Sequence, residues 1–132
     1  MAEAPGDRIL VTGALGQIGT ELVSKLRKKH GNDTVLATDI RVPDDDRYFP
    51  EGPFRNLSVL DGEAMEKTVT DEGIGTVYHL AAILSATGEK NPDLCQRVNV
   101  GGTVTVLEVA RDFDLKVFAP SSIAVFGPDS PK

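Results

Sequence analysis

The sequence predicts a single α/β domain built on a doubly wound parallel sheet of about five strands. Three observations lead to this prediction. Strand and helix signals alternate along the 132 residues, which is typical of βαβ units. A glycine-rich turn joins the first strand signal to the first helix signal. The fourth strand signal is apolar throughout, as expected for a strand that helices cover on both faces.

The chain first forms a strand, Arg8 to Thr12, and then a helix from Gln17 to Lys29. Three glycines spaced three apart span the junction, and their bare backbone lets a polyanion approach the main chain closely. The helix start adds unpaired N–H groups and the positive end of the helix dipole. Together these features predict a site for the pyrophosphate of a dinucleotide. The residues expected to contact it are Gly13, Gly16, Gln17, Ile18 and Gly19.

The second strand, Thr34 to Thr38, leads directly into Asp39, twenty residues after Gly19. A carboxylate at this strand end accepts both ribose hydroxyls of an adenosine and repels a 2′-phosphate, which favours NAD over NADP. The alternative is that Asp39 is a helix cap or a loop residue. Arg41 keeps NADP open, because a nearby arginine can accommodate a 2′-phosphate. A nucleotide triphosphatase loop is excluded, since no Gly-Lys-Ser/Thr sequence follows the glycines.

Prolines, aspartates and a glycine between Arg41 and Pro53 predict a surface loop. A short third strand lies within Phe54 to Leu60, and a helix covers Glu63 to Glu72. Asp61 lies between that strand and that helix. It has two interpretations: it hydrogen-bonds the adenine amine of the cofactor, or it caps the helix. The residues expected to face inward from the helix are Ala64, Met65, Thr68 and Val69.

The fourth strand is predicted at Thr76 to Ala82, and its carboxyl end belongs to the ligand crevice of such a sheet. We expect the cofactor to lie across the last residues of this strand, where two small alanines follow a leucine. These residues are Leu80, Ala81 and Ala82. His79 is interpreted as a hydrogen-bonded core histidine rather than as a general base.

A long helix from Pro92 to about Phe113 comes next, although Gly101 and Gly102 weaken it by about 1 kcal/mol each. The fifth strand, Lys116 to Pro120, leads into two serines at the edge where the crevice opens. A serine hydroxyl there can orient a substrate hydroxyl or carbonyl, but serines are also ordinary turn residues. The helix residues expected to face inward are Val98, Val104, Leu107, Val109 and Ala110.

The composition argues against several classes of protein. The net charge of -6 disfavours a nucleic-acid partner, which requires a basic face. No run approaches about 18 apolar residues, so no membrane span is expected. The start of the chain shows no targeting signal, and the single cysteine, Cys95, excludes an internal disulfide. We therefore expect a cytoplasmic protein with no metal site, in which Cys95 packs within a helix.

Several motifs together resemble the extended short-chain dehydrogenase/reductase family, which also contains nucleotide-sugar epimerases and dehydratases. They are Thr12 to Gly19, Asp39, His79 to Ala82, Asn99-Val100 and Ser121 to Gly127. Within the family, residues 81–92 (AAILSATGEKNP) and 120–128 (PSSIAVFGP) resemble the subgroup of L-threonine 3-dehydrogenases most closely. The resemblance covers almost the whole chain and implies a Rossmann-type fold.

The resemblance implies that the threonine β-hydroxyl is oxidised to 2-amino-3-oxobutanoate and that the hydride passes to NAD. Ser122 would then be the catalytic serine that hydrogen-bonds the reacting hydroxyl. Ser121 and Ser85 would lie near the substrate, which is L-threonine. Asn99 would support the nicotinamide side of the cofactor site, and full-length members of the family form homodimers.

The chain departs from the family at the catalytic base, a Tyr-x-x-x-Lys pair about 25 residues beyond the serine. Both tyrosines, Tyr48 and Tyr78, precede Ser122, and neither has a lysine four residues later. We expect residues 1–132 to be an incomplete NAD-binding domain that lacks the Tyr-x-x-x-Lys helix and the substrate-binding part. Alone it is expected to be inactive, and its dimerisation is doubtful. The alternatives are an NAD-binding module without catalysis, a fragment of a nucleotide-sugar epimerase or dehydratase, and a mitochondrial parent with a leader.

Overall fold

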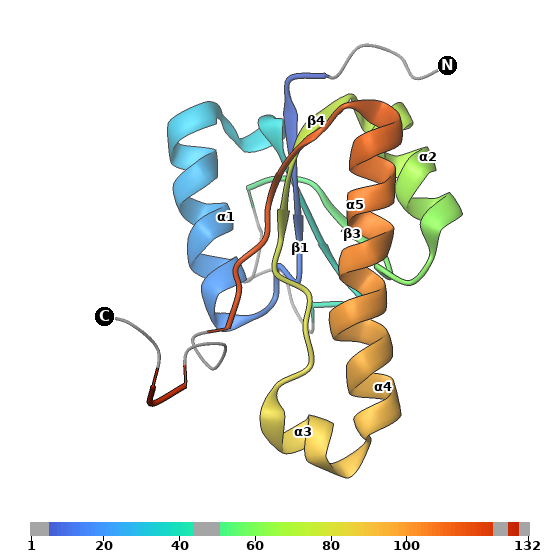
Figure 1. Ribbon diagram of the computed structural model, residues 1–132. Coiled ribbons are helices and arrows are strands. Elements are labelled where there is room, and N and C mark those ends of the chain that lie inside the picture. Colours follow the sequence, from blue (N-terminus) through green and yellow to red (C-terminus); the bar gives the residue numbers. More distant parts are fainter. Residues whose placement is uncertain (1–5, 44–50, 123–126, 130–132) are drawn as a thin grey trace.

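The computed structural model describes residues 6–43, 51–122 and 127–129 and shows a five-stranded parallel sheet flanked by helices (Figure 1). The strand order is β3-β2-β1-β4-β5, and every neighbouring pair is parallel. This confirms the predicted Rossmann-type α/β fold. The strands are β1 (Arg8–Thr12), β2 (Val35–Asp39), β3 (Phe54–Asn56), β4 (Ile74–His79) and β5 (Lys116–Phe118).

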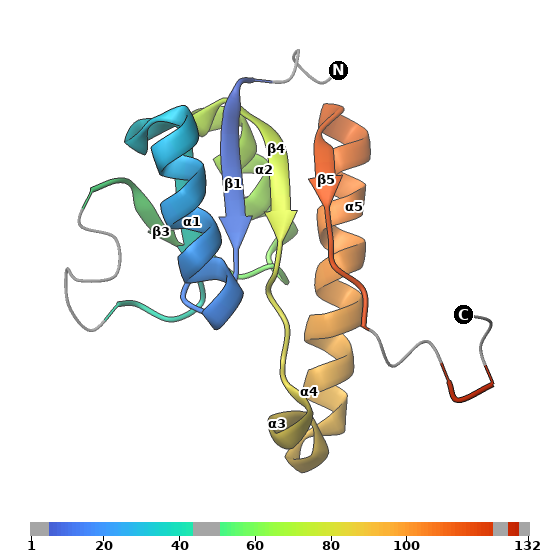
Figure 2. The same cartoon turned by 90° about the vertical axis from the view of Figure 1, so that its left-hand side faces the viewer.

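Helices cover both faces of the sheet (Figure 2). α1 lies on one face against β1 and β2, while α2 and α5 lie on the other. The helices are α1 (Gln17–His30), α2 (Gly62–Glu72), α3 (Ser85–Lys90), α4 (Pro92–Gln96) and α5 (Gly102–Phe113), with a 3-10 turn η1 (Asn32–Thr34) and a π-helical segment η2 (Arg97–Gly101). α4, η2 and α5 follow one another without a break, so the predicted long helix exists with a π-helical centre. No helix among the described residues is long and apolar enough to cross a membrane.

The core consists of two apolar layers, because side chains alternate between the faces of a strand. In β1, Ile9 and Val11 pack in the layer under α1, whereas Leu10 packs in the layer under α2 and α5. Each fully buried aliphatic side chain contributes about 1.5–3 kcal/mol relative to exposure. Because these strands are parallel, the carboxyl ends of β1, β2 and β4 lie at one edge of the sheet, where the turn into α1 begins (Figure 2).

Strand boundaries differ from the prediction in β2, β4 and β5, and β2 is displaced by one residue, to Val35–Asp39. β4 begins at Ile74 and ends at His79, so the last predicted strand residues, 80–82, lie beyond the sheet. The chain leaves the sheet there because the Ala81 N–H bonds to the Thr12 side chain. β5 ends at Phe118, earlier than expected, whereas β3 (Phe54–Asn56) lies within the predicted range. The short helix α3 was not predicted, because its sequence SATGEK has no apolar period.

The expected inward side of the long helix is wrong at two positions. Val104 and Leu107 are 48% and 50% exposed, while Val106, Val109 and Ala110 are buried. The helix carries apolar residues on more than one side, and the sheet takes only one of them. For α2 the prediction is confirmed, since its buried residues are Met65, Thr68 and Val69, and Ala64 packs against them.

Candidate functional site

The turn between β1 and α1 packs directly against the chain that leaves β4. Gly13 has a left-handed backbone (φ 65°), and a Cβ there would lie 2.7 Å from the Ala81 nitrogen and 2.8 Å from the Leu80 carbonyl carbon. A Cβ at Gly19 would clash with the Gly13 carbonyl oxygen and with the backbone of Ala14. The fold therefore requires glycine at both positions, Gly13 for the turn and Gly19 for the close packing of α1.

Gly16 differs from the other two glycines because a Cβ there would make one tight contact rather than a clash. A Cβ there would meet only the Gly13 carbonyl oxygen, at 3.3 Å. Gly16 is the N-cap of α1, its φ of -74° suits any residue, and no side chain caps the helix. The first turn, which starts with the exposed Gln17 and Ile18, contains no acidic residue. Its N–H groups have no acceptor within the helix, so this end of α1 offers donors and a positive dipole to an anion.

Asp39 ends β2 beside this turn, where its side chain is only 6% exposed. Its Oδ2 accepts a hydrogen bond from the Leu15 N–H (3.0 Å), and its Oδ1 accepts one from the Arg41 N–H (3.0 Å). The exposed Arg41 guanidinium also pairs with Oδ1 at 3.4 Å. The carboxylate is thus held between the glycine turn and the loop after β2.

Asp61 caps α2, which confirms one of its two interpretations. Its Oδ1 accepts a hydrogen bond from the Ala64 N–H at 3.1 Å. The contact of Asp61 with adenine stays a prediction.

The segment after β4 is held by Asn99 from the π-helical segment η2. The Ile83 N–H donates to Asn99 Oδ1 (2.7 Å), and Asn99 Nδ2 donates back to the Ile83 carbonyl (3.1 Å). Asn99 Nδ2 also approaches Cys95 Sγ at 3.3 Å, which places the half-buried Cys95 inside the helix packing. Leu80 and Ala81 are half-buried, and Ala82 is exposed. Asn99 therefore sets the path of the residues across which the cofactor was predicted to lie.

His79 is a buried core histidine, as its sequence position indicated. Its Nδ1 lies 2.8 Å from the Thr12 hydroxyl, and its Nε2 lies 3.3 Å from the Thr103 hydroxyl. Burial lowers the pKa of His79 below 6.5. The neutral ring is satisfied by these two hydroxyls, so His79 is part of the scaffold of the site.

The predicted substrate residues follow the carboxyl ends of β4 and β5. Ser121 and Ser122 are exposed and follow β5. Ser85 begins α3, and its side chain lies outside what the structure describes. Residues 123–126 of the predicted serine motif also lie outside the described residues.

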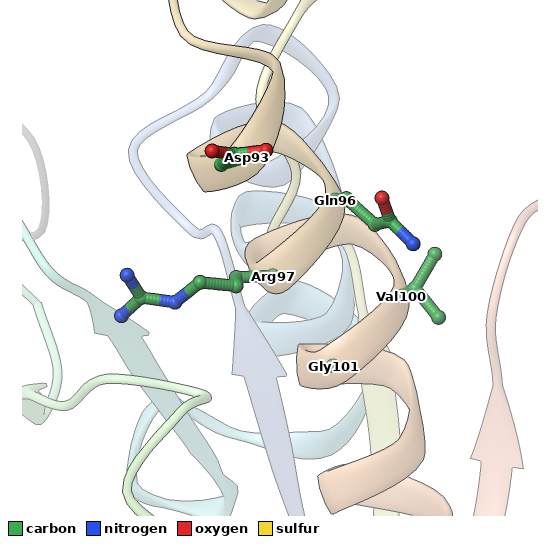
Figure 3. Close-up of a pocket in the computed structure, with 5 residues that line it drawn as sticks. All are labelled: Asp93, Gln96, Arg97, Val100 and Gly101. Carbon is green, nitrogen blue, oxygen red and sulfur yellow. The ribbon is translucent and has the colours of Figure 1, made fainter.

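A surface hollow lies on α4 and η2 and is lined by Asp93, Gln96, Arg97, Val100 and Gly101 (Figure 3). All five come from one helical stretch, and all except the half-buried Gly101 are exposed. None of them was predicted to bind cofactor or substrate. Among the described residues, no group of three or more His, Cys, Asp or Glu could hold a metal ion.

Sequence reasoning missed three contributors to this edge. Leu15 donates its N–H to Asp39, and the Thr12 and Thr103 hydroxyls bind His79. Thr12 belongs to the glycine motif, so its position was a signal. The roles of Leu15 and Thr103 depend on contacts between distant segments, which no local pattern shows.

The sequence profile of the NAD dependent epimerase/dehydratase family matches residues 9–132. An uncharacterized epimerase/dehydratase of Staphylococcus haemolyticus is 53% identical over 126 residues, which are 96% of this chain and 40% of that protein. The crystal structure of L-threonine dehydrogenase from Phytophthora infestans has 48% identity and a TM-score of 0.85, over 94% of this chain and 39% of that one.

A UDP-glucose 4-epimerase structure from Thermotoga maritima, determined with UDP-glucose, has 28% identity and a TM-score of 0.77. The alignment covers 87% of this chain and 38% of that one. The chain thus spans about two fifths of the length of the proteins it matches.

Proposed function

This chain belongs to the NAD dependent epimerase/dehydratase family, and on that premise we propose that it binds NAD at the carboxyl ends of β1, β2 and β4. The observation that carries the proposal is the difference in what a Cβ would meet at each of the three glycines. Gly13 and Gly19 are required by the packing of the turn, whereas a Cβ at Gly16, at an uncapped helix start, would make a single tight contact, at 3.3 Å with the Gly13 carbonyl oxygen. A bare backbone at that helix start suits a pyrophosphate.

The residues around the turn fit the remaining parts of NAD. In this proposal the N–H groups of Gln17 and Ile18 bind the pyrophosphate, and Asp39 accepts the adenosine ribose hydroxyls. Asp61 serves the adenine amine in addition to its cap. Leu80, Ala81 and Ala82 line the floor, and Asn99 supports the nicotinamide side through its hold on Ile83. NAD supplies a hydride acceptor at that end of the crevice.

For the whole protein we propose NAD-dependent oxidation of L-threonine. Support comes from the 48% identity to the Phytophthora infestans L-threonine dehydrogenase, against 28% to the Thermotoga maritima epimerase. Ser122 would hydrogen-bond the reacting hydroxyl and fix its direction, while Ser121 and Ser85 would contact the substrate. We propose a cytoplasmic protein whose full-length form is a homodimer.

The second candidate is a nucleotide-sugar epimerase or dehydratase, which the family and the structural match to the UDP-glucose 4-epimerase support. Both candidates use the same NAD site. They are separated by incubating the full-length protein and NAD with L-threonine or with UDP-glucose. We expect NADH to accumulate with threonine only. Epimerised UDP-glucose without net NADH would favour the second candidate.

The NAD site itself is tested by Gly16→Ala, with Gly62→Ala as the matched control. Both glycines lie at helix starts, and a Cβ at Gly62 would meet only the Thr105 methyl group at 3.8 Å. Gly16→Ala should weaken NAD binding at least about tenfold, because crowding a packed contact costs about 1–3 kcal/mol. Losing the N-cap glycine should lower the unfolding free energy by no more than about 1 kcal/mol.

Calorimetric titration with NAD measures the affinity, and circular dichroism checks that both variants remain folded. Gly62→Ala should bind NAD like the unaltered chain. An unchanged affinity in Gly16→Ala would mean that the pyrophosphate lies elsewhere, and the proposed site would be rejected.

A further inference from the structure

A chain of side-chain hydrogen bonds crosses the molecule directly beneath the proposed cofactor site. It runs from Thr12 at the end of β1 to His79 at the end of β4 (2.8 Å) and on to Thr103 in α5 (3.3 Å). The Thr103 hydroxyl then donates to the backbone carbonyl of Asn99 in η2 (2.8 Å). The ends of β1 and β4 and the continuous helix of η2 and α5 are thereby joined by three consecutive bonds.

The direction of every bond in this chain follows from its ends. Thr12 Oγ1 accepts the N–H groups of Leu80 (3.1 Å) and Ala81 (3.2 Å), so its lone pairs are used and its own proton points to His79 Nδ1. Thr103 spends its proton on the Asn99 carbonyl, so it accepts from His79 Nε2–H. His79 is therefore the neutral tautomer with its proton on Nε2.

Both ends of the chain touch backbone that the proposed NAD site uses. Thr12 immediately precedes Gly13, and its hydroxyl holds the first two residues after β4. The side-chain amide of Asn99 binds both the backbone N–H and the backbone carbonyl of Ile83. The segment that follows β4 is thus fixed from β1 at one end and from η2 at the other, with His79 between them.

We propose that His79 and Thr103 are positioning residues for the cofactor. They couple the glycine turn to the segment 80–83 and so fix the distance between these two parts of the proposed site. The proposal rests on the proposed NAD function. It assigns the coupling to the single tautomer of His79 that the neighbouring hydroxyls select.

A protonated His79 would not fit this arrangement. Both of its nitrogens would then donate, and Thr12 Oγ1 would face a third N–H while losing the acceptor of its own proton. The partners of the ring on β1 and α5 are hydroxyls, and burial is the only cause of the lowered pKa of His79, so no charged neighbour offsets a proton there.

The test compares Thr103→Val with Thr105→Val. Thr105 is the matched control, because it lies in the same helix, is also half-buried, and donates its hydroxyl to the Gly101 carbonyl (3.0 Å) outside the chain of bonds. Thr103→Val leaves His79 Nε2–H without its acceptor. We expect about tenfold weaker NAD binding, which corresponds to one lost hydrogen bond. Thr103→Ser restores the hydroxyl and should restore the affinity.

Nuclear magnetic resonance on the same proteins gives a readout that does not depend on NAD. The imidazole nitrogen shifts should show the Nε2–H tautomer of His79 in the unaltered chain. In Thr103→Val, but not in Thr105→Val, the Ala81 and Ile83 amides should exchange with solvent about tenfold faster. Thr103→Ser should return these rates to those of the unaltered chain.

The proposal is overturned if Thr103→Val and Thr105→Val match in NAD affinity and amide exchange, or if His79 carries its proton on Nδ1. Failure of the unaltered chain to bind NAD would reject the proposed function instead. In that case the tautomer and the exchange rates still decide whether His79 and Thr103 position the segment 80–83.

Discussion

Gly13, Gly16 and Gly19 are the same residue type at equal spacing, yet a Cβ would meet a different environment at each. The backbone of residues 80–81 crowds Gly13, and the turn itself crowds Gly19, whereas a Cβ at Gly16 would make one tight contact with the Gly13 carbonyl oxygen. The sequence predicts a pyrophosphate site at these glycines, and that site stays a prediction. The sequence could not show which of the glycines the fold requires, because that depends on how β4 passes the turn.

Other residues divide in the same way. The position of Asp39 at the end of β2 could be predicted from the sequence. Its hydrogen bond from the Leu15 N–H could not, since that bond joins segments that are distant in sequence. Asp61 carried two interpretations of comparable merit, and the structure shows the cap. For His79 the apolar strand around it was enough to predict burial, while its two hydroxyl partners required the structure.

The buried His79 predicts a pH dependence of stability. Burial lowers the pKa of His79 in the folded chain below 6.5, its ordinary value in the unfolded chain. Between the folded and the unfolded pKa, the unfolded chain therefore binds a proton that the folded chain does not. Stability is therefore complete above about pH 6.5 and falls as the pH drops towards the folded pKa. The slope contributed by one proton is at most about 1.4 kcal/mol per pH unit.

Urea unfolding between about pH 7.5 and 5.5 measures this effect. His79→Gln, which cannot be protonated in this range, should lower stability at neutral pH and flatten the slope. His30→Gln, at the exposed end of α1, is the control and should keep the slope. A slope that survives in His79→Gln would show that another group is responsible.

At the scale of elements, the long helix shows where periodicity succeeds and where it fails. Its span from Pro92 to Phe113 was predictable, because a proline starts it and the glycines at 101 and 102 weaken the helix without ending it. Its orientation was not, because apolar residues occupy two sides and the sheet buries only one. The π-helical segment η2 was also invisible to the sequence pattern, although it carries Asn99. Strand ends were missed where apolar residues continue past the last ladder bond, as after His79.

Alanine substitutions at the two adjacent glycines of this helix should change the unfolding free energy in opposite directions. A Cβ at Gly102 would lie 2.7 Å from a methyl carbon of the buried Val59, whereas one at Gly101 would meet a Leu60 methyl carbon at an ordinary 3.8 Å. Gly101→Ala should therefore raise the unfolding free energy by up to about 1 kcal/mol through helix propensity. Gly102→Ala should lower it by about 1–2 kcal/mol, because overpacking outweighs the same gain.

Chemical denaturation of the two variants side by side measures both effects. The pair serves as its own control, since each adds one methyl group to the same helix. Equal effects of the two substitutions would show that α5 does not approach Val59 as closely as described.

At the scale of the whole molecule, the sheet order β3-β2-β1-β4-β5 brings the glycine turn, Asp39 and the segment after β4 to one edge. The alternation of strands and helices was enough to predict a doubly wound parallel sheet, whereas the order of its strands required the structure. Apolar surface stays exposed elsewhere: Phe118 on β5 is 57% exposed, and it contacts Tyr78 with ring centroids 5.7 Å apart.

We propose that this edge binds NAD and that Asp39 selects NAD over NADP, and parallel titrations of the chain with the two cofactors test this directly. We predict saturable NAD binding and at least about tenfold weaker NADP binding, because repulsion between a 2′-phosphate and a carboxylate a few ångströms away exceeds about 1 kcal/mol. Arg41→Ala should keep this preference, since the Arg41 guanidinium is already paired with Asp39. NADP binding as tight as NAD binding, or no binding of either, would contradict the account.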